Sequence, residues 1–278
     1  MNRGAVARLL GLVVLIMLLV AALLTPVPAR ADRVAVPAPV MLRLQHSSMQ
    51  YTDTPAEKRH DARLVFTTGA DMISFTEVGT KQNAIGQRYL RASARAAGYR
   101  IWFPGFEGGI AVRRGVGRIV AHGYFGPILP GVARDHPSIG LAWVTVDVPG
   151  AGLVTYGVTH AMTGDFVAAR HALNDDLASE VARVEKKKAA GPALTFFAED
   201  ANRNDAHQDL MPGLPFTTCW DELGYHPHTR DSRTIDVVGS YDHDGRVSAH
   251  SARVLRLGLF TDHRSILATY AVAPLRKD

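Results

Sequence analysis

Short apolar runs with strand character recur along this 278-residue chain, and they constrain its fold more than any other feature. Glycine, proline and helix-like segments separate them, which is the alternation expected of an α/β protein. Strands are predicted at 40–44, 63–66, 72–75, 109–112, 118–124, 139–148, 153–158, 193–197, 234–240, 246–255 and 265–272. Two further segments, 81–97 and 165–188, have the apolar spacing of amphipathic helices.

Two glycine-containing stretches, 115–117 and 242–245, are predicted to be hairpin turns between consecutive strands. The first would make 109–112 and 118–124 neighbours, and 139–148 is expected beside them. The second has a faint likeness to a calcium loop, but the ligands that should follow are missing.

The composition requires the core to hold the chain together. Hydrophobic residues make up 47% of the sequence and charged residues 21%, as in an ordinary globular protein. Cys219 is the only cysteine, so no internal disulfide can form. We expect Cys219 to be buried beside Trp220, because no residue near it in sequence would activate a catalytic thiol.

The N-terminus has the order of a signal peptide. Arg3 and Arg8 precede an unbroken apolar run at 9–24, and the small residues Ala29 and Ala31 follow it. The run has 16 residues, whereas a membrane-spanning helix needs about 20. We therefore predict a signal peptide at 1–31, cleavage after Ala31 and a secreted protein that contacts the membrane only during export.

Cleavage would change the charge balance of the chain. It would remove Arg3, Arg8 and Arg30 and no acidic residue, so the formal charge would fall from +5 to +2. A nearly balanced chain gives only weak support for nucleic acid as a partner, although local basic patches remain compatible with it.

Ionisable and amide side chains lie at or beside the ends of several predicted strands, where catalytic groups often converge in an α/β protein. Glu77 follows 72–75, and His160 follows 153–158. Asp200 and Asn202 follow 193–197. The remaining members of the set are Asp236, within 234–240, and Asp262 and His263, just before 265–272.

Taken in this order, the segments resemble the endonuclease/exonuclease/phosphatase superfamily, which includes deoxyribonuclease I. The resemblance spans roughly residues 40–274. It rests on Glu77 after an apolar strand, Thr159-His160, Asp200-x-Asn202, Ile235-Asp236 and Asp262-His263. It implies one catalytic domain at 40–278 after a short lead-in at 32–39. The implied fold is a four-layer α/β/β/α sandwich with two central mixed sheets and helices on both outer faces.

Metal-dependent phosphodiester hydrolysis suits these residue types. Glu77 and Asp262 are hard oxygen ligands for Mg²⁺ or Mn²⁺. Asp200 would orient or deprotonate the attacking water, and Asn202 would hold that water or a phosphate oxygen. His160 and His263 would contact the scissile phosphate. The resemblance further implies that Asp236 pairs with His263 and favours its charged form.

Three positions depart from the family pattern, of which Ala201, in place of a larger residue, affects packing alone. The family usually has asparagine at the end of the first strand, where this chain has Ser48, a poorer metal ligand. Gln45 or His46 could compensate, depending on which side chain points inward. A glycine commonly precedes the catalytic aspartate, but Glu199 stands there and could raise the pKa of Asp200 or recruit a second cation.

Several alternatives stay open at this level. Asp200-x-Asn202 is also the pattern of an Asx turn leaving a strand. The pair His226 and His228 lacks a spacing that favours zinc. Substrate choice would depend on the loops 126–138 and 204–230.

The favoured function is that of an exported, monomeric nuclease acting on nucleic acid or another phosphodiester. A phosphatase or phospholipase C-like enzyme acting on a lipid headgroup or a small organophosphate is the alternative within enzymes. A catalytically silent binding protein on the same scaffold is the alternative of another class.

Overall fold

The computed structural model describes residues 38–50, 52–78, 84–103, 108–125, 141–160, 194–202, 216–241 and 245–274. The chain divides into two compact units, Met1–Pro37 and Ala38–Asp278, and the described residues belong to the second. The predicted signal peptide at 1–31 and the predicted helix at 165–188 lie outside them. None of the helices in the described ranges is long and apolar enough to cross a membrane.

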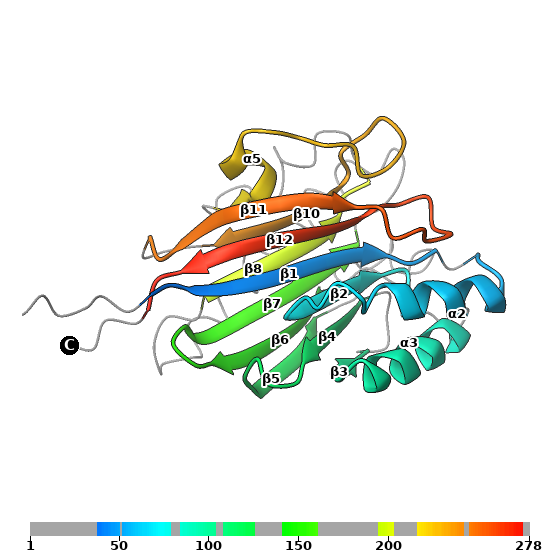
Figure 1. Cartoon of the computed structure of the whole chain (residues 1–278), viewed down its shortest axis with the longest axis horizontal. Helices are drawn as coiled ribbons and strands as arrows, with labels where there is room; N and C mark the ends of the chain where they lie inside the picture. The colour runs from blue at the N-terminus through cyan, green and yellow to red at the C-terminus, as the bar shows by residue number, and fades with distance from the viewer. Residues whose placement is uncertain are drawn as a thin grey trace, which may run out of the picture. The chain divides into compact units, whose positions relative to one another are not determined.

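Two mixed six-stranded sheets form the centre of the described part (Figure 1). Sheet A has the order β11 (Val247–Leu255), β12 (Ser265–Val272), β1 (Val40–Ser48), β2 (Met72–Thr76), β4 (Gly109–Arg113), β3 (Tyr99–Trp102). Sheet B has the order β5 (Arg118–Phe125), β6 (Leu141–Val148), β7 (Gly152–His160), β8 (Leu194–Asp200), β10 (Asp236–Tyr241), β9 (Phe216–Thr218). Among the described strands, the pairs β1–β2 and β7–β8 are parallel and the other neighbours are antiparallel. The predicted fold class is confirmed.

The two sheets pack face to face through one hydrophobic core. Leu42 and Leu44 of β1 are fully buried in it, and the Phe196 ring of β8 packs against Tyr270 of β12 at 4.9 Å between centroids. Successive side chains of a strand point to opposite faces. The even-numbered residues of β1 and of β8 therefore point into the space between the sheets.

Helices cover the outer face of sheet A. α2 (Pro55–Leu64) and α3 (Ala84–Ala96) lie side by side there, as Figure 1 shows. A second cluster of buried side chains, including Phe75 and Leu90, fills the space beneath them. A third helix, α5 (Cys219–Leu223), follows β9, and Cys219 and Trp220 are buried there without a disulfide, as predicted.

The predicted strand at 63–66 is wrong, because these residues lie at the end of α2. Those residues form the last turn of the helix and the turn after it. Thr54 caps the helix: its side chain accepts the Glu57 N–H, and the Glu57 carboxylate accepts the Thr54 N–H. The residues Thr54-Pro55-Ala56-Glu57 have the sequence pattern of a capping box, which predicts the start of a helix. The helix that starts there includes the first part of the short apolar run that we interpreted as a strand.

The two predicted hairpins are wrong, because each stretch joins different sheets. Residues 115–117 connect β4 of sheet A to β5 of sheet B, so 109–112 and 118–124 are not neighbours. β5 and β6 do pair, as predicted. Residues 242–244 lie outside the described residues, but β10 before them and β11 after them belong to different sheets. Gly117 has no room for a side chain, since a Cβ there would lie 2.3 Å from the Asp147 carbonyl oxygen.

Candidate active site

The strand registers bring the ends of four strands to one edge of the sandwich. In sheet A, Ser48 at the end of β1 pairs with Thr76 at the end of β2, and Glu77 follows directly. In sheet B, Asp200 pairs with both His160 and Asp236. Residues far apart in sequence therefore meet, as the order of strand-end residues predicted.

Glu77, His160 and Asp200 form a tight group. Each offers one ligand atom, and these atoms all lie within 4.8 Å of one another. Asp200 is fully buried, whereas Glu77 and His160 are half-buried. Glu77 has a positive φ of 60°, an uncommon conformation for a residue other than glycine. The end of β2 thus turns the carboxylate toward sheet B at the cost of backbone strain.

The Asp200 carboxylate is the centre of the site. Its Oδ2 lies 3.5 Å from His160 Nε2, 3.6 Å from His263 Nε2 and 3.4 Å from Ser48 Oγ. Two imidazoles, from β7 and from the loop before β12, therefore face one oxygen atom. The pair of histidines expected to contact one phosphate does converge on one point.

Asn202 takes part in both arrangements that its pattern allowed. Its backbone N–H donates to Asp200 Oδ1 at 3.1 Å, which is the Asx turn, and its φ is 51°. Its side-chain Nδ2 lies 2.9 Å from His160 Nε2. The turn that ends β8 therefore also orients the Asn202 amide into the site.

Asp236 and His263 form the expected pair. His263 Nδ1 lies 3.0 Å from both carboxylate oxygens of Asp236, and both side chains are buried. Burial alone lowers the pKa of His263, but the charge and hydrogen bond of Asp236, with the charges of Asp200 and Asp262, raise it to about 9. Burial opposes charge on Asp236 too, yet His263 and then His46 hold its pKa well below the usual range. The pair is held as imidazolium and carboxylate.

Thr229 fixes this pair in place, and nothing in the sequence marked it. Its hydroxyl accepts the backbone N–H groups of Ile235 and Asp236, both at 3.0 Å. Its carbonyl oxygen accepts the N–H of Arg264, the residue after His263. One buried threonine therefore ties the start of β10 to the loop that carries the histidine.

At the end of β1, His46 points into the space between the sheets and Gln45 points away from it. His46 and Ser48 face sheet B, whereas the Gln45 side chain bonds to Ser47 and the Val65 carbonyl. His46 Nε2 lies 3.6 Å from Asp236 Oδ1 and has no hydrogen-bond partner in the described residues. A second imidazole thus flanks the carboxylate that orients His263.

Glu199 does not extend the cluster. It neighbours Asp200 along β8, and strand alternation points its side chain to the opposite, outer face of sheet B. Phe197, two residues earlier on that face, lines an outer pocket with Trp143. Glu199 is buried away from the site, so the expectation that it recruits a second cation beside Asp200 is not supported.

Asp262 lies at the rim and outside the Glu77 group. Its Oδ2 lies 2.5 Å from Arg230 Nη2, and its Oδ1 is 3.7 Å from His263 Nε2. Its side chain is 41% exposed. Among the described residues, the two groups able to hold a metal are Glu77 with His160 and Asp200, and Asp200 with Asp236 and His263. Asp262 is in neither group, so its role as a metal ligand stays a prediction.

The loops expected to set specificity are described only in part. Residues 126–138 and 203–215 lie outside the described ranges. In the remainder, Trp220 is buried, and Tyr225 is 42% exposed and packs edge-on against it. His226 Nε2 lies 3.6 Å from Asp221 Oδ1, and neither His226 nor His228 belongs to a group of potential metal ligands in the described residues.

The donor set fits a hard divalent cation. Glu77 and Asp200 bring two carboxylates together with an imidazole, and Mg²⁺ typically takes one or two carboxylates while keeping several waters. Two acidic groups this close also repel each other unless a cation lies between them.

The His263 pKa predicts how stability depends on pH. The pKa of His263 is about 9 in the folded chain and near 6.5 when unfolded, so its stabilisation is complete below pH 6.5. It is lost as the pH rises through 9. We expect the free energy of unfolding, measured with urea in chelator, to fall between pH 7 and 10. A His263→Gln variant should show a much smaller fall; equal falls would refute the assignment.

Comparison with known structures supports the fold. Zebrafish (D. rerio) TDP2 complexed with single-strand DNA product is 15% identical, covers 84% of this chain and 99% of its own, and has a TM-score of 0.65. An endonuclease/exonuclease/phosphatase from Bacteroides vulgatus is 14% identical, and the match covers 84% of this chain and 99% of that protein, with a TM-score of 0.65. The human Nocturnin catalytic domain with bound sulfate is 14% identical, and the match covers 84% of this chain and 94% of that domain, with a TM-score of 0.65. No family model and no curated protein matches the sequence.

Proposed function

Because the chain has the fold of the endonuclease/exonuclease/phosphatase superfamily, we propose that it hydrolyses phosphodiester bonds with the help of a divalent cation. The observation that carries the proposal is the convergence of His160 and His263 on Asp200 Oδ2, beside Glu77. A buried carboxylate between two imidazoles is costly for a fold to maintain without a chemical use.

Glu77 is the carboxylate that would hold the cation, with Asp200 and His160 close beside it. A bound Mg²⁺ or Mn²⁺ would neutralise a non-bridging phosphate oxygen and so favour attack on phosphorus. Ser48, 3.4 Å from Asp200 Oδ2, would orient that carboxylate through its hydroxyl. Ser48 thus takes the position at the end of β1 where the family usually has asparagine, although a serine hydroxyl is a weaker metal ligand.

The remaining side chains have distinct tasks. Asp200 orients the attacking water and accepts its proton, because its Oδ2 faces the centre of the site. Asn202 and His160, 2.9 Å apart, hold phosphate oxygens. His263 Nε2 is buried without a hydrogen-bond partner, so it can donate to the oxygen that gains charge. Asp236 keeps that imidazole oriented and charged.

We propose nucleic acid as the substrate. The structure of zebrafish TDP2 holds single-strand DNA product, and that protein covers 84% of this chain. A small phosphomonoester or a lipid headgroup would need the same metal and the same histidines, so the site chemistry alone does not separate these substrates.

A panel of substrates tests the proposal. The purified protein is incubated with Mg²⁺ or Mn²⁺ and plasmid DNA, single-stranded DNA, RNA, a chromogenic phosphodiester or a phosphoinositide. We expect cleavage of a nucleic acid and of the chromogenic diester. Hydrolysis of the phosphoinositide alone would contradict nucleic acid as the substrate and identify a lipid headgroup instead. No hydrolysis of any substrate would favour a catalytically silent binding protein.

We also propose export, on the charge, apolar and small-residue order of 1–31. Expression in a secreting bacterial host, followed by N-terminal sequencing of the protein in the medium, should show Asp32 as the first residue. A variant with Ala29→Arg and Ala31→Arg should remain uncleaved. Protein that keeps Met1 in the membrane fraction would contradict the proposal.

A further inference from the structure

Five exposed arginines gather on the outer side of α2 and α3. Arg59 and Arg63 are four residues apart on α2, and Arg88, Arg91 and Arg95 are spaced by three and four on α3. Side chains at these spacings share one side of a helix. The buried residues of α3, Gly86, Leu90 and Ala94, lie on its other side. We call the five residues the arginine face.

Acidic side chains do not neutralise this face. The two helices contain only Glu57 and Asp61 as acids. The Glu57 carboxylate caps its own helix at the Thr54 N–H, and Asp61 is buried and accepts the N–H of Phe260. In the part of the chain that the structure describes, none of the five guanidinium groups forms an ion pair.

The face also brings two of its charges together. Arg59 of α2 lies over the Tyr89 ring of α3 at 5.0 Å and donates to the Tyr89 hydroxyl at 3.2 Å. Arg88 lies 5.8 Å from the centre of the same ring. Both guanidinium groups therefore lie beside one tyrosine ring, and neither has an acidic partner among the described residues. The arrangement therefore fits a ligand that carries several negative charges.

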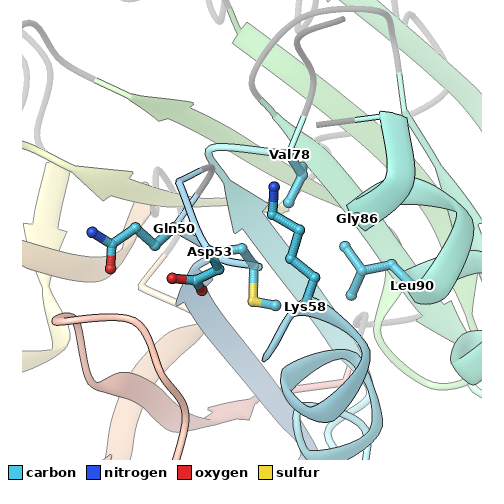
Figure 2. A pocket seen from close by; sticks show the side chains of 7 residues that line it. Gln50, Asp53, Lys58, Val78, Gly86 and Leu90 are labelled. Carbon is cyan, nitrogen blue, oxygen red and sulfur yellow. The ribbon is translucent and has the colours of Figure 1, made fainter. Parts of the chain in front are cut away.

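The arginine face adjoins the active site. α2 begins soon after Ser48 and α3 soon after Glu77, and both helices run away from the site edge. A small pocket lies between their starts and is lined by Met49, Gln50, Asp53, Lys58, Val78, Gly86 and Leu90. Figure 2 shows the Lys58 side chain extending toward Val78, with Asp53 on one side and Leu90 on the other. The first turns of both helices therefore lie beside the edge of the sandwich that carries the site.

We propose that the arginine face binds the phosphate backbone of a nucleic acid whose cleaved bond lies in the site. This inference rests on the proposed function. From Arg88 to Arg95 the helix rises about 10 Å, the length of about three nucleotide steps along one strand of a duplex. Ile85 is the only large apolar side chain exposed on the described parts of the two helices, whereas a membrane-binding helix presents an apolar stripe. The binding is sequence-independent, since it uses phosphates.

The test removes three charges and measures binding separately from catalysis. In the variant Arg88→Gln/Arg91→Gln/Arg95→Gln, the substitutions are exposed and helix-compatible. Binding of a fluorescent single-stranded DNA is followed by anisotropy in chelator at several salt concentrations. The slope of log K against log salt should become shallower by about 2 to 3, and Kd at 0.1 M salt should rise on the order of 100-fold.

A control variant loses the same charge elsewhere. Arg114→Gln/Arg118→Gln/Arg253→Gln changes three exposed arginines outside the two helices. Its Kd should stay within about twofold of wild type. Unchanged DNA binding in the α3 variant, or equal losses in both variants, would overturn the proposal. So would an α3 variant that loses binding to phosphatidylglycerol vesicles but keeps DNA binding, which would identify a membrane surface as the partner.

Hydrolysis separates this proposal from the proposed function. The α3 variant should hydrolyse the small chromogenic diester at the wild-type rate and cleave DNA with a raised KM and an unchanged kcat. A loss of diester hydrolysis in this variant would show that the arginines act on the site itself and would overturn the proposal. If wild type binds DNA through the face but cleaves no phosphodiester, the binding surface stands and the proposed function fails.

Discussion

Replacing Glu77 with alanine is expected to reduce phosphodiester hydrolysis by about 10²–10³-fold or more. Glu77 supplies one of the two carboxylates beside His160, and its positive φ positions it there. Without Glu77, this group of described residues loses the carboxylate that would hold the cation. The measurement is kcat/KM on a chromogenic phosphodiester at saturating Mg²⁺ or Mn²⁺.

A matched control makes the Glu77 result specific. Asp147→Ala removes an acidic residue at the opposite end of sheet B, where Asp147 pairs with Arg118 at 3.5 Å, and should leave kcat/KM within about twofold. Both variants should unfold at urea concentrations close to wild type, because neither side chain is in the core. Wild-type activity in the Glu77 variant would place the metal elsewhere.

The second large effect concerns His160 and His263. Each alanine variant should lose about 10²–10⁴-fold in turnover, because both imidazoles act on the same phosphate. The double variant should lose less than the product of the two losses, since residues that stabilise one transition state are not independent. Asp236→Asn should behave as a milder His263→Ala, because Asp236 acts only through the imidazole it orients.

His250 is the control for these variants, since it is an exposed histidine on β11. His250→Ala should keep wild-type turnover, and all variants are checked by circular dichroism for an intact fold. Unchanged turnover in both His160→Ala and His263→Ala would show that the active site is wrongly placed.

Much of the fold and of the candidate site could be predicted, because the site residues lie at or beside the ends of apolar strands that can be recognised from the sequence alone. Asp200 and His160 end buried parallel strands, and that position alone brings their side chains to the same edge. The pairing of Asp236 with His263 followed from the family resemblance. The structure adds only its geometry, with Nδ1 at 3.0 Å from both oxygens.

Other features depend on tertiary geometry that a single sequence does not encode locally. Whether 115–117 forms a hairpin or crosses to the other sheet depends on which partner β4 and β5 find. The ion pair between Asp262 and Arg230 joins residues 32 positions apart, and only the fold brings them together. Thr229 and His46 act through neighbours in the same way, and neither carries a motif of its own.

The direction of a side chain also decided some assignments. Glu199 and Asp200 are adjacent acids in the sequence, yet strand alternation points one away from the site and the other into it. The inward side chain of β1 became clear only once the register of β1 with β2 and β12 was known.

The central claim is metal-dependent hydrolysis at the group of Glu77, His160 and Asp200. The most direct measurement is the rate of phosphodiester hydrolysis by the purified protein in excess chelator, followed by titration with Mg²⁺ or Mn²⁺. The claim predicts loss of turnover in chelator, recovery on adding the cation, and no comparable recovery in Glu77→Ala at the same cation concentration. Full turnover in excess chelator would contradict it.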